Sequence, residues 1–194
     1  MILTPMFFIT NIGLGVGLAM DAFSVSLANG LNEPCMKGKK MALVAGVFGI
    51  FQGLMPLIGW FCIRTVVQYF TFFENLIPWI ALALLSYIGG KMLIEGIANK
   101  DEQSPCVALT FGGLMVQGVA TSIDALSVGF NIAHYDLPTA VLAAVLIAAV
   151  TFVICFAGLY IGKKAGTKLA GKAGILGGII LILIGLEIFI TSFF

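Results

Sequence analysis

Two aspartates stand in near-duplicate apolar sequences, each inside a stretch long enough to cross a membrane. Asp21 lies in the string MDAFSV and Asp124 in the string IDALSV. A carboxylate at the centre of a membrane helix costs roughly 2.5–3.5 kcal/mol on insertion scales, so its default interpretation is functional. Because the cost occurs at matched positions, we expect one symmetric intramembrane site. The alternative is plain packing with a buried, protonated Asp in each half.

A third polar residue, Gln52, lies in the middle of another apolar stretch, shortly before Pro56. Proline has no backbone N–H, so Pro56 should kink a helix and free a carbonyl near position 52. The Gln52 oxygen and the freed carbonyl are both hard oxygen donors. Gln52 is therefore either a cation ligand or a hydrogen-bond link to a neighbouring helix.

Hydroxyl groups accompany the second aspartate. Thr121 and Ser122 precede Asp124 by less than a turn, and Gln117 lies on nearly the same helix face. Oxygen ligands of these kinds suit Mg, Ca or Mn better than Cu(I) or Zn. Two carboxylates would neutralise a divalent cation, and after its loss at least one should take up a proton. This chemistry indicates exchange of a metal ion for protons.

Other polar residues have simpler alternatives. Lys91 and Glu95 have the i, i+4 spacing of an ion pair, although a role at a cytoplasmic metal vestibule or in gating is equally open. Glu187 also falls within an apolar stretch, where Lys91 is its repeat counterpart and a candidate partner. Asn29 ends its stretch and is expected to be a helix cap.

The composition defines the elements that must position these residues. Hydrophobic residues make up 60% of the 194 residues, charged residues only 10%, and the mean hydropathy is +1.12. A membrane span needs about 20 apolar residues and must be helical, because the bilayer core offers no water to the backbone. We therefore predict an all-α polytopic membrane protein with six transmembrane helices, at residues 6–29, 41–63, 76–97, 107–131, 138–161 and 174–192.

The spans divide into two repeats. The offset that joins the two aspartates also pairs Ser24 with Ser127 and Leu57-Ile58-Gly59 with Tyr160-Ile161-Gly162. With three spans in each repeat, 1–99 and 100–194, the second enters the membrane from the opposite side. Such inverted repeats are typical of secondary transporters with a midplane site. Small residues four apart, Gly13 and Gly17 before Asp21, predict close helix packing on that face.

Charge sets the orientation. Eight lysines fall in the first, third and fifth loops, against only Arg64 on the opposite face. The positive-inside bias puts these loops in the cytoplasm and both termini outside. No GxxxxGK[ST] motif suggests an ATP-driven pump, and the net charge of +1 gives no pull toward nucleic acid. The four scattered cysteines indicate neither a disulfide framework nor a zinc site. The oligomeric state is open, and a homo-oligomer is allowed.

Several strings together resemble the MntP-type manganese efflux pumps of the bacterial inner membrane, which are related to the LysE-like exporters. They are MDAFSVSLANG, FQGLMPLIGW, GGKMLIEG, TSIDALSVG and LGGIILILIG, and they extend over all six spans. The resemblance implies two inverted helix triplets and export of Mn²⁺ as the transported substrate, with no cofactor. It also matches Asp21 and Asp124 to the family's essential acids, and Gln52 and Glu95 to polar positions of its second and third spans. Cys155 and Glu187 depart from the family pattern.

Three functions were weighed on these grounds. The first is a Mn²⁺ exporter coupled to protons or to membrane potential. The second keeps the architecture but exports another divalent metal or a cationic amino acid, although the spans offer no midplane basic residue for an amino-acid carboxylate. The third is a membrane protein that transports nothing. No His or Ser/His set supports an enzyme, and no catalytic residue is expected.

Overall fold

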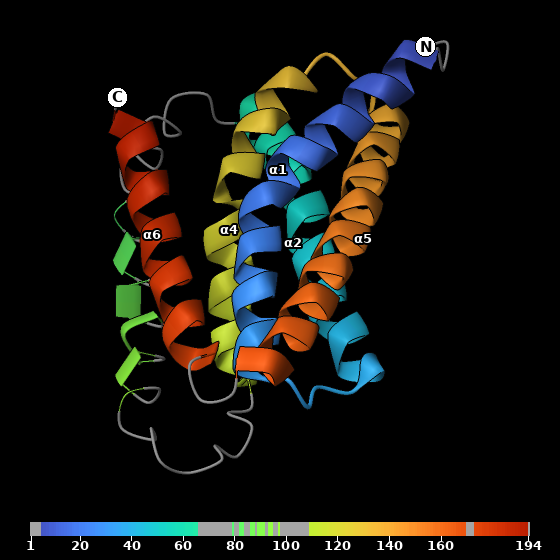
Figure 1. Cartoon of the computed structure of the whole chain (residues 1–194). Coiled ribbons are helices and arrows are strands. Elements are labelled where there is room, and N and C mark those ends of the chain that lie inside the picture. Colours follow the sequence, from blue (N-terminus) through green and yellow to red (C-terminus); the bar gives the residue numbers. More distant parts are fainter. Residues whose placement is uncertain are drawn as a thin grey trace.

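The computed structural model describes residues 5–65, 109–169 and 173–193, and between them positions 79, 82–83, 86–87, 89–91, 93–94 and 97. Its long helices are α1 (Pro5–Asn32), α2 (Gly38–Thr65), α4 (Phe111–Asn131), α5 (Leu137–Leu169) and α6 (Ala173–Phe193), drawn in Figure 1. The described positions between 79 and 97 are helical as well. The rest of the expected third span, 76–97, lies outside the described residues.

The helices have the length and surface of membrane spans. Among the described residues, α1, α2, α4 and α5 are each long and apolar enough to cross a bilayer, and α6 adds the shorter apolar stretch Ile175–Ile184. Large apolar side chains also cover outward faces, as on α2 at Leu43, Ile50, Leu54, Ile58 and Phe61. An apolar exterior matches a hydrocarbon surrounding. The prediction of an all-α polytopic membrane protein is confirmed at this level.

Local signals set the helix ends. The Thr110 carbonyl accepts the Leu114 N–H at 3.0 Å, so α4 begins at Phe111 and not at 107. Asp136 caps α5, since its carbonyl accepts the Ala140 N–H at 2.9 Å and its carboxylate accepts the Thr139 hydroxyl at 2.6 Å.

The far end of α5 differs from expectation. This helix continues to Leu169, so Lys163, Lys164 and Lys168 lie on it and not in a loop. A helix of 33 residues is about 50 Å long, which exceeds the roughly 30 Å of hydrocarbon. The lysine-bearing end therefore extends past the apolar layer. Lys163 Nζ also donates to the Met36 carbonyl at 2.7 Å, which holds this end against the connection from α1 to α2.

Glycines set the direction in which α1 and α5 pack. A Cβ built on Gly15 would lie 3.3 Å from Ile147 Cα, and one on Gly30 would lie 2.5 Å from the Leu159 carbonyl oxygen. Higher residue numbers on α1 therefore meet higher numbers on α5, and the two helices run parallel. Their packing is the most extensive among the helices that the structure describes.

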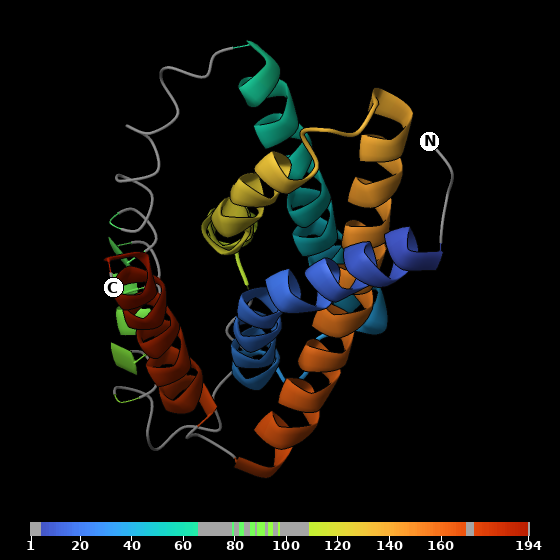
Figure 2. The ribbon, with the colours of Figure 1, turned by 90° about the horizontal axis from the view of Figure 1, so that it is seen from above.

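The α2 helix packs on two partners. It is parallel to α4, because the Phe51 ring lies against Gly118 and Gly59 lies against Gly129. It is antiparallel to α5, because Gly49 meets Ala148 whereas Gly53 meets Ala144. Seen from above in Figure 2, α1, α2, α4 and α5 form one group, with α6 to one side beside α1.

The parallel pair α2 and α4 restricts the path between them. Both run in the same direction, so Thr65 and Phe111, which residues 66–110 join, lie at opposite ends of the bundle. Within that part, Gly89 packs against Gly178 of α6, where an added Cβ would lie 2.7 Å from the Gly178 carbonyl oxygen. The start of α1 and the end of α6 lie at the same end of the bundle (Figure 1).

Two sequence expectations about packing and cysteines are wrong. No described atom lies within 4 Å of a Cβ built on Gly13 or Gly17; the close-packed glycines of α1 are Gly15 and Gly30, on a different face. The spacing was correct for a small-residue stripe, but a helix with so many small residues has more than one such stripe. Cys35 is disulfide-bonded, with a partner outside the described residues, whereas Cys62 and Cys155 are free thiols.

Candidate cation site

The two aspartates come from different halves of the chain and interact. Asp21 is half-buried on α1, and Asp124 is exposed on α4. The two carboxylates repel one another electrostatically. Asp124 Oδ1 also accepts the Ala125 backbone N–H at 2.9 Å, which orients its carboxylate. Two acids that repel each other in an apolar surrounding provide a strong attraction for a cation.

A buried pair of amides sets the register of α1 against α4. Asn29 Nδ2 donates to Gln117 Oε1 at 2.7 Å, and Gln117 Nε2 donates to Asn29 Oδ1 at 3.3 Å. Asn29 is 2% exposed and Gln117 is fully buried. Asn29 is therefore a link between helices and not the expected cap.

This register brings the aspartates level with each other. Asp21 precedes Asn29 by eight residues on α1, and Asp124 follows Gln117 by seven on α4. The helices are antiparallel, so at 1.5 Å per residue both aspartates lie about 11 Å from the amide pair in the same direction. The two aspartates therefore lie at a similar height along the bundle.

Gln52 presents an unused oxygen beside the same helix. Its Nε2 donates to the Leu18 carbonyl at 2.8 Å, less than one turn from Asp21. Its Oε1 is buried and has no hydrogen-bond partner. A buried acceptor without a partner is costly, so it calls for a ligand or water. Both interpretations of Gln52 thus have support: the amide nitrogen links α2 to α1, and the oxygen remains for a ligand.

The two hydroxyls near Asp124 are engaged within α4. Thr121 donates to the Gln117 carbonyl at 2.9 Å, and Ser122 donates to the Gly118 carbonyl at 2.6 Å. Each oxygen keeps lone pairs after donating. A further buried hydroxyl without a hydrogen-bond partner occurs at Thr151 on α5. It is not among the predicted ligands, because Ser and Thr in apolar helices usually bond their own backbone.

The remaining candidates are described only in part. Pro56 lies inside the continuous α2 and is buried. Lys91 is exposed in the described part of the third span. Glu95 lies outside the described residues, and for Glu187 only the backbone, in α6, is described. Their predicted ion pairs stay predictions.

The candidate ligands are mostly oxygen atoms of amides, hydroxyls and carboxylates. Over the described ranges, no three His, Cys, Asp or Glu side chains gather closely enough to hold a metal ion. A cation between Asp21 and Asp124 would therefore complete its shell with amide, hydroxyl or backbone oxygens. Such a mixed oxygen shell is typical of Mg²⁺, Ca²⁺ and Mn²⁺.

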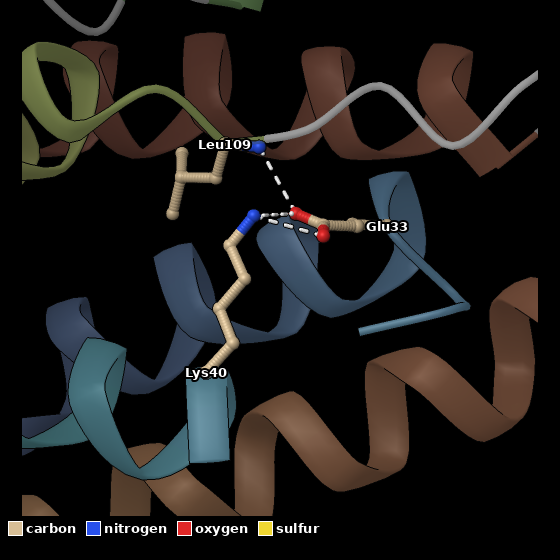
Figure 3. Close-up of polar contacts among 3 residues, drawn as sticks. All are labelled: Glu33, Lys40 and Leu109. Carbon is tan, nitrogen blue, oxygen red and sulfur yellow. Dashed lines mark hydrogen bonds and ion pairs between the residues drawn. The ribbon is translucent and has the colours of Figure 1, made fainter. Parts of the chain in front are cut away.

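A polar cluster that the sequence analysis missed lies at the other end of α1. Lys40 Nζ contacts both carboxylate oxygens of Glu33, at 2.9 and 2.7 Å, and the Leu109 N–H donates to Glu33 Oε2 at 3.0 Å (Figure 3). Glu33 is only 7% exposed. In the sequence, Glu33 is followed by Pro34 and then by several lysines. Such a pattern is typical of a charged residue in a solvent-exposed loop.

The fold and site together define a polytopic helical membrane protein with an acidic pair between two of its spans. A family profile described as "Putative manganese efflux pump" matches residues 35–189. The chain belongs to this family, the MntP family.

Curated relatives agree over nearly the whole chain. The "Putative manganese efflux pump MntP" of Clostridium perfringens strain 13 is 42% identical over 195 residues, covering 90% of each chain. The protein of the same name from Ruminiclostridium cellulolyticum is 41% identical over 186 residues, covering 93% of this chain and 94% of the relative. "Putative manganese efflux pump MntP 2" of Clostridium botulinum strain Hall is 39% identical over 192 residues, covering 94% of each. No solved structure matches the chain. These names are those of transporters and not of enzymes.

Proposed function

We propose that this protein exports Mn²⁺ from the cytoplasm by exchange with protons, through one site that contains Asp21 and Asp124 with Gln52, Thr121 and Ser122. The observation that carries the proposal is the electrostatic repulsion between Asp21 on α1 and Asp124 on α4. The buried Gln52 oxygen without a partner adds support on the same side of α1. The relatives' names supply the choice of manganese.

The exchange follows from charge balance. Two carboxylates neutralise one Mn²⁺, so the loaded site carries little net charge in a low-dielectric layer. After the metal leaves, two like charges in that layer repel, and proton uptake removes the repulsion. The empty carrier would then return with protons in place of metal. Neither half of the site could complete this cycle alone.

The helix directions support an inverted repeat of residues 1–99 and 100–194. A two-fold axis in the membrane plane that relates α1 to α4 and α2 to α5 would turn the parallel pair α1–α5 into the parallel pair α4–α2. Both pairs occur, and both cross at glycines, Gly30 on Gly162 and Gly129 on Gly59.

The proposed orientation places the lysine-bearing end of the bundle in the cytoplasm. Lys37, Lys39 and Lys40 lie at the α1–α2 connection, near the end of α5 that carries Lys163. The protein would lie in the inner membrane of a bacterium, with both termini on the extracytoplasmic side. A homo-oligomer remains allowed in this arrangement.

The test is metal content in cells. A strain without its own manganese exporter should accumulate less manganese when it expresses the wild type, but not when it expresses Asp21→Asn or Asp124→Asn at equal membrane levels. Loss of an outer-shell partner costs about 10–100-fold in metal affinity, so loss of a direct ligand should cost at least as much. A wild type that fails to lower manganese, or two variants that lower it as well as wild type, would overturn the proposal.

The coupling ion needs purified protein. In proteoliposomes, Mn²⁺ flux should accelerate when the compartment that receives the metal is made acidic, because protons then drive the return step. Flux that ignores the pH gradient but follows membrane potential would leave a uniporter. Competition by Mg²⁺, Ca²⁺, Fe²⁺ and lysine in the same assay ranks the substrates, and displacement by lysine alone would favour a cationic amino acid.

A further inference from the structure

The helices that carry the two aspartates are joined by two polar links at the lysine-bearing end of the bundle. The first is the buried Asn29–Gln117 amide pair. The second is Glu33, one turn further along α1, which binds Lys40 and the Leu109 N–H just before α4. We call these five residues the inner clasp. Its amide pair lies about 11 Å along the helices from the aspartates, and Glu33 lies about 18 Å from Asp21.

The second link is unusually well shielded for a charged pair. The Glu33 side chain is only 9% exposed and that of Lys40 is 33% exposed. Hydrogen bonds to charged groups stabilise more than neutral ones, and this carboxylate accepts two donors. Residues 33 and 109 are far apart in sequence, so the bond joins the end of the first helix to the start of the fourth.

The opposite end of the same region is closed by apolar and aromatic groups instead. Phe7 and Tyr135 rings lie 5.6 Å apart, and Trp60 Nε1 donates to the Tyr135 carbonyl at 3.1 Å. Water can replace the partners of a polar link once it opens, whereas it cannot replace aromatic packing. The polar end is therefore the better candidate for a gate.

We propose that the inner clasp is the cytoplasmic gate, and that Glu33 is a positioning residue which holds α1 and α4 closed between the aspartates and the cytoplasm. This inference rests on the proposed function for its sidedness and substrate. When only a fraction of the protein is in the binding-competent state, the apparent Kd equals the intrinsic Kd divided by that fraction. Breaking the clasp should therefore tighten the apparent affinity for cytoplasmic Mn²⁺.

Glu33→Gln distinguishes a gate from a surface-charge effect, because the two predict opposite changes in the half-saturating Mn²⁺ concentration. If Glu33 acted only as a surface charge, its loss would weaken the attraction for cations and raise the half-saturating Mn²⁺ concentration. Loss of the gate should lower it, by about tenfold if one charge-assisted link is lost, since a tenfold change corresponds to about 1.4 kcal/mol. The assay is Mn²⁺ uptake into inside-out vesicles, with the metal alone as the probe.

Two further variants keep the test open if Glu33→Gln does not fold. Lys40→Gln should lower the half-saturating concentration more than Lys39→Gln, because both remove one positive charge but exposed Lys39 has no place in the clasp. If wild-type vesicles take up no Mn²⁺, the proposed function fails. If they do, and these variants show an unchanged or raised half-saturating concentration, the gate fails alone.

Discussion

In the proposed site Asp21 and Asp124 act as a pair, and their alignment depends on two residues that are not proposed ligands. The Asn29–Gln117 amides fix the register of α1 and α4, and this register makes the two carboxylates level. A shift of one turn would separate them by about 5 Å along the axis. The amide pair is therefore part of the proposed site, because it aligns the two carboxylates.

The Gln52 side chain has separable roles at its two terminal atoms. Gln52→Glu keeps an acceptor oxygen but loses the donor to Leu18, whereas Gln52→Leu loses both. If the oxygen binds metal, Gln52→Leu should lower Mn²⁺ affinity by about 10-fold or more and Gln52→Glu should retain transport.

A control for this comparison is Thr151→Val, which removes a buried hydroxyl on α5 that is not among the proposed ligands. It should leave Mn²⁺ affinity close to wild type in the same vesicle assay. Equal affinity for Gln52→Leu and wild type would show that Gln52 serves only to join α2 to α1.

At the scale of elements, glycines decide how near the helices come. A Cβ on Gly30 would lie 2.5 Å from the Leu159 carbonyl oxygen and 2.9 Å from the Lys163 nitrogen, both backbone atoms. Backbone cannot move aside as a side chain can. Gly30→Ala should therefore destabilise the protein by about 1–3 kcal/mol, as other overpacked sites do.

Gly13→Ala on the same helix is the control, because no described atom lies within 4 Å of its Cβ. There the better helix propensity of alanine should leave thermal stability in detergent equal or higher. If Gly30→Ala melts at the wild-type temperature, the α1–α5 crossing is looser than described here.

The sequence was sufficient for the helices and insufficient for their contacts. Hydropathy located each described span to within a few residues, except where α5 continues through Lys163 and Lys164 to Leu169. A lysine-bearing helical turn outside the bilayer has no hydropathy signal. The stripe of Gly13 and Gly17 was wrong as a packing face, because spacing alone does not say which side of a helix meets a neighbour.

The candidate site shows the same division. Matched motifs identified Asp21 and Asp124, but nothing in one sequence pairs Asn29 with Gln117 or Glu33 with Leu109. Such links depend on the register between helices that are far apart in the chain. Proline and lysine neighbours made Glu33 look like part of a solvated loop.

For the molecule as a whole, the parallel pairs α1–α5 and α2–α4 predict a definite topology. A phosphatase that is active only outside the cytoplasm should be active when fused after Phe194 and inactive when fused after Lys164. The reverse pattern would show that the protein has the opposite orientation, with the inner clasp on the extracytoplasmic side. Equal activity at both positions would contradict the arrangement of the helices itself.

The central claim is that two aspartates from two halves of the chain form a single manganese site. Mn²⁺ binding to the purified protein, followed by the loss of the free-ion paramagnetic resonance signal, tests it most directly. We expect one tightly bound Mn²⁺ per chain in the wild type and none in either Asp21→Asn or Asp124→Asn. Two ions per chain in the wild type, with one retained by each variant, would show two independent half-sites and contradict the account.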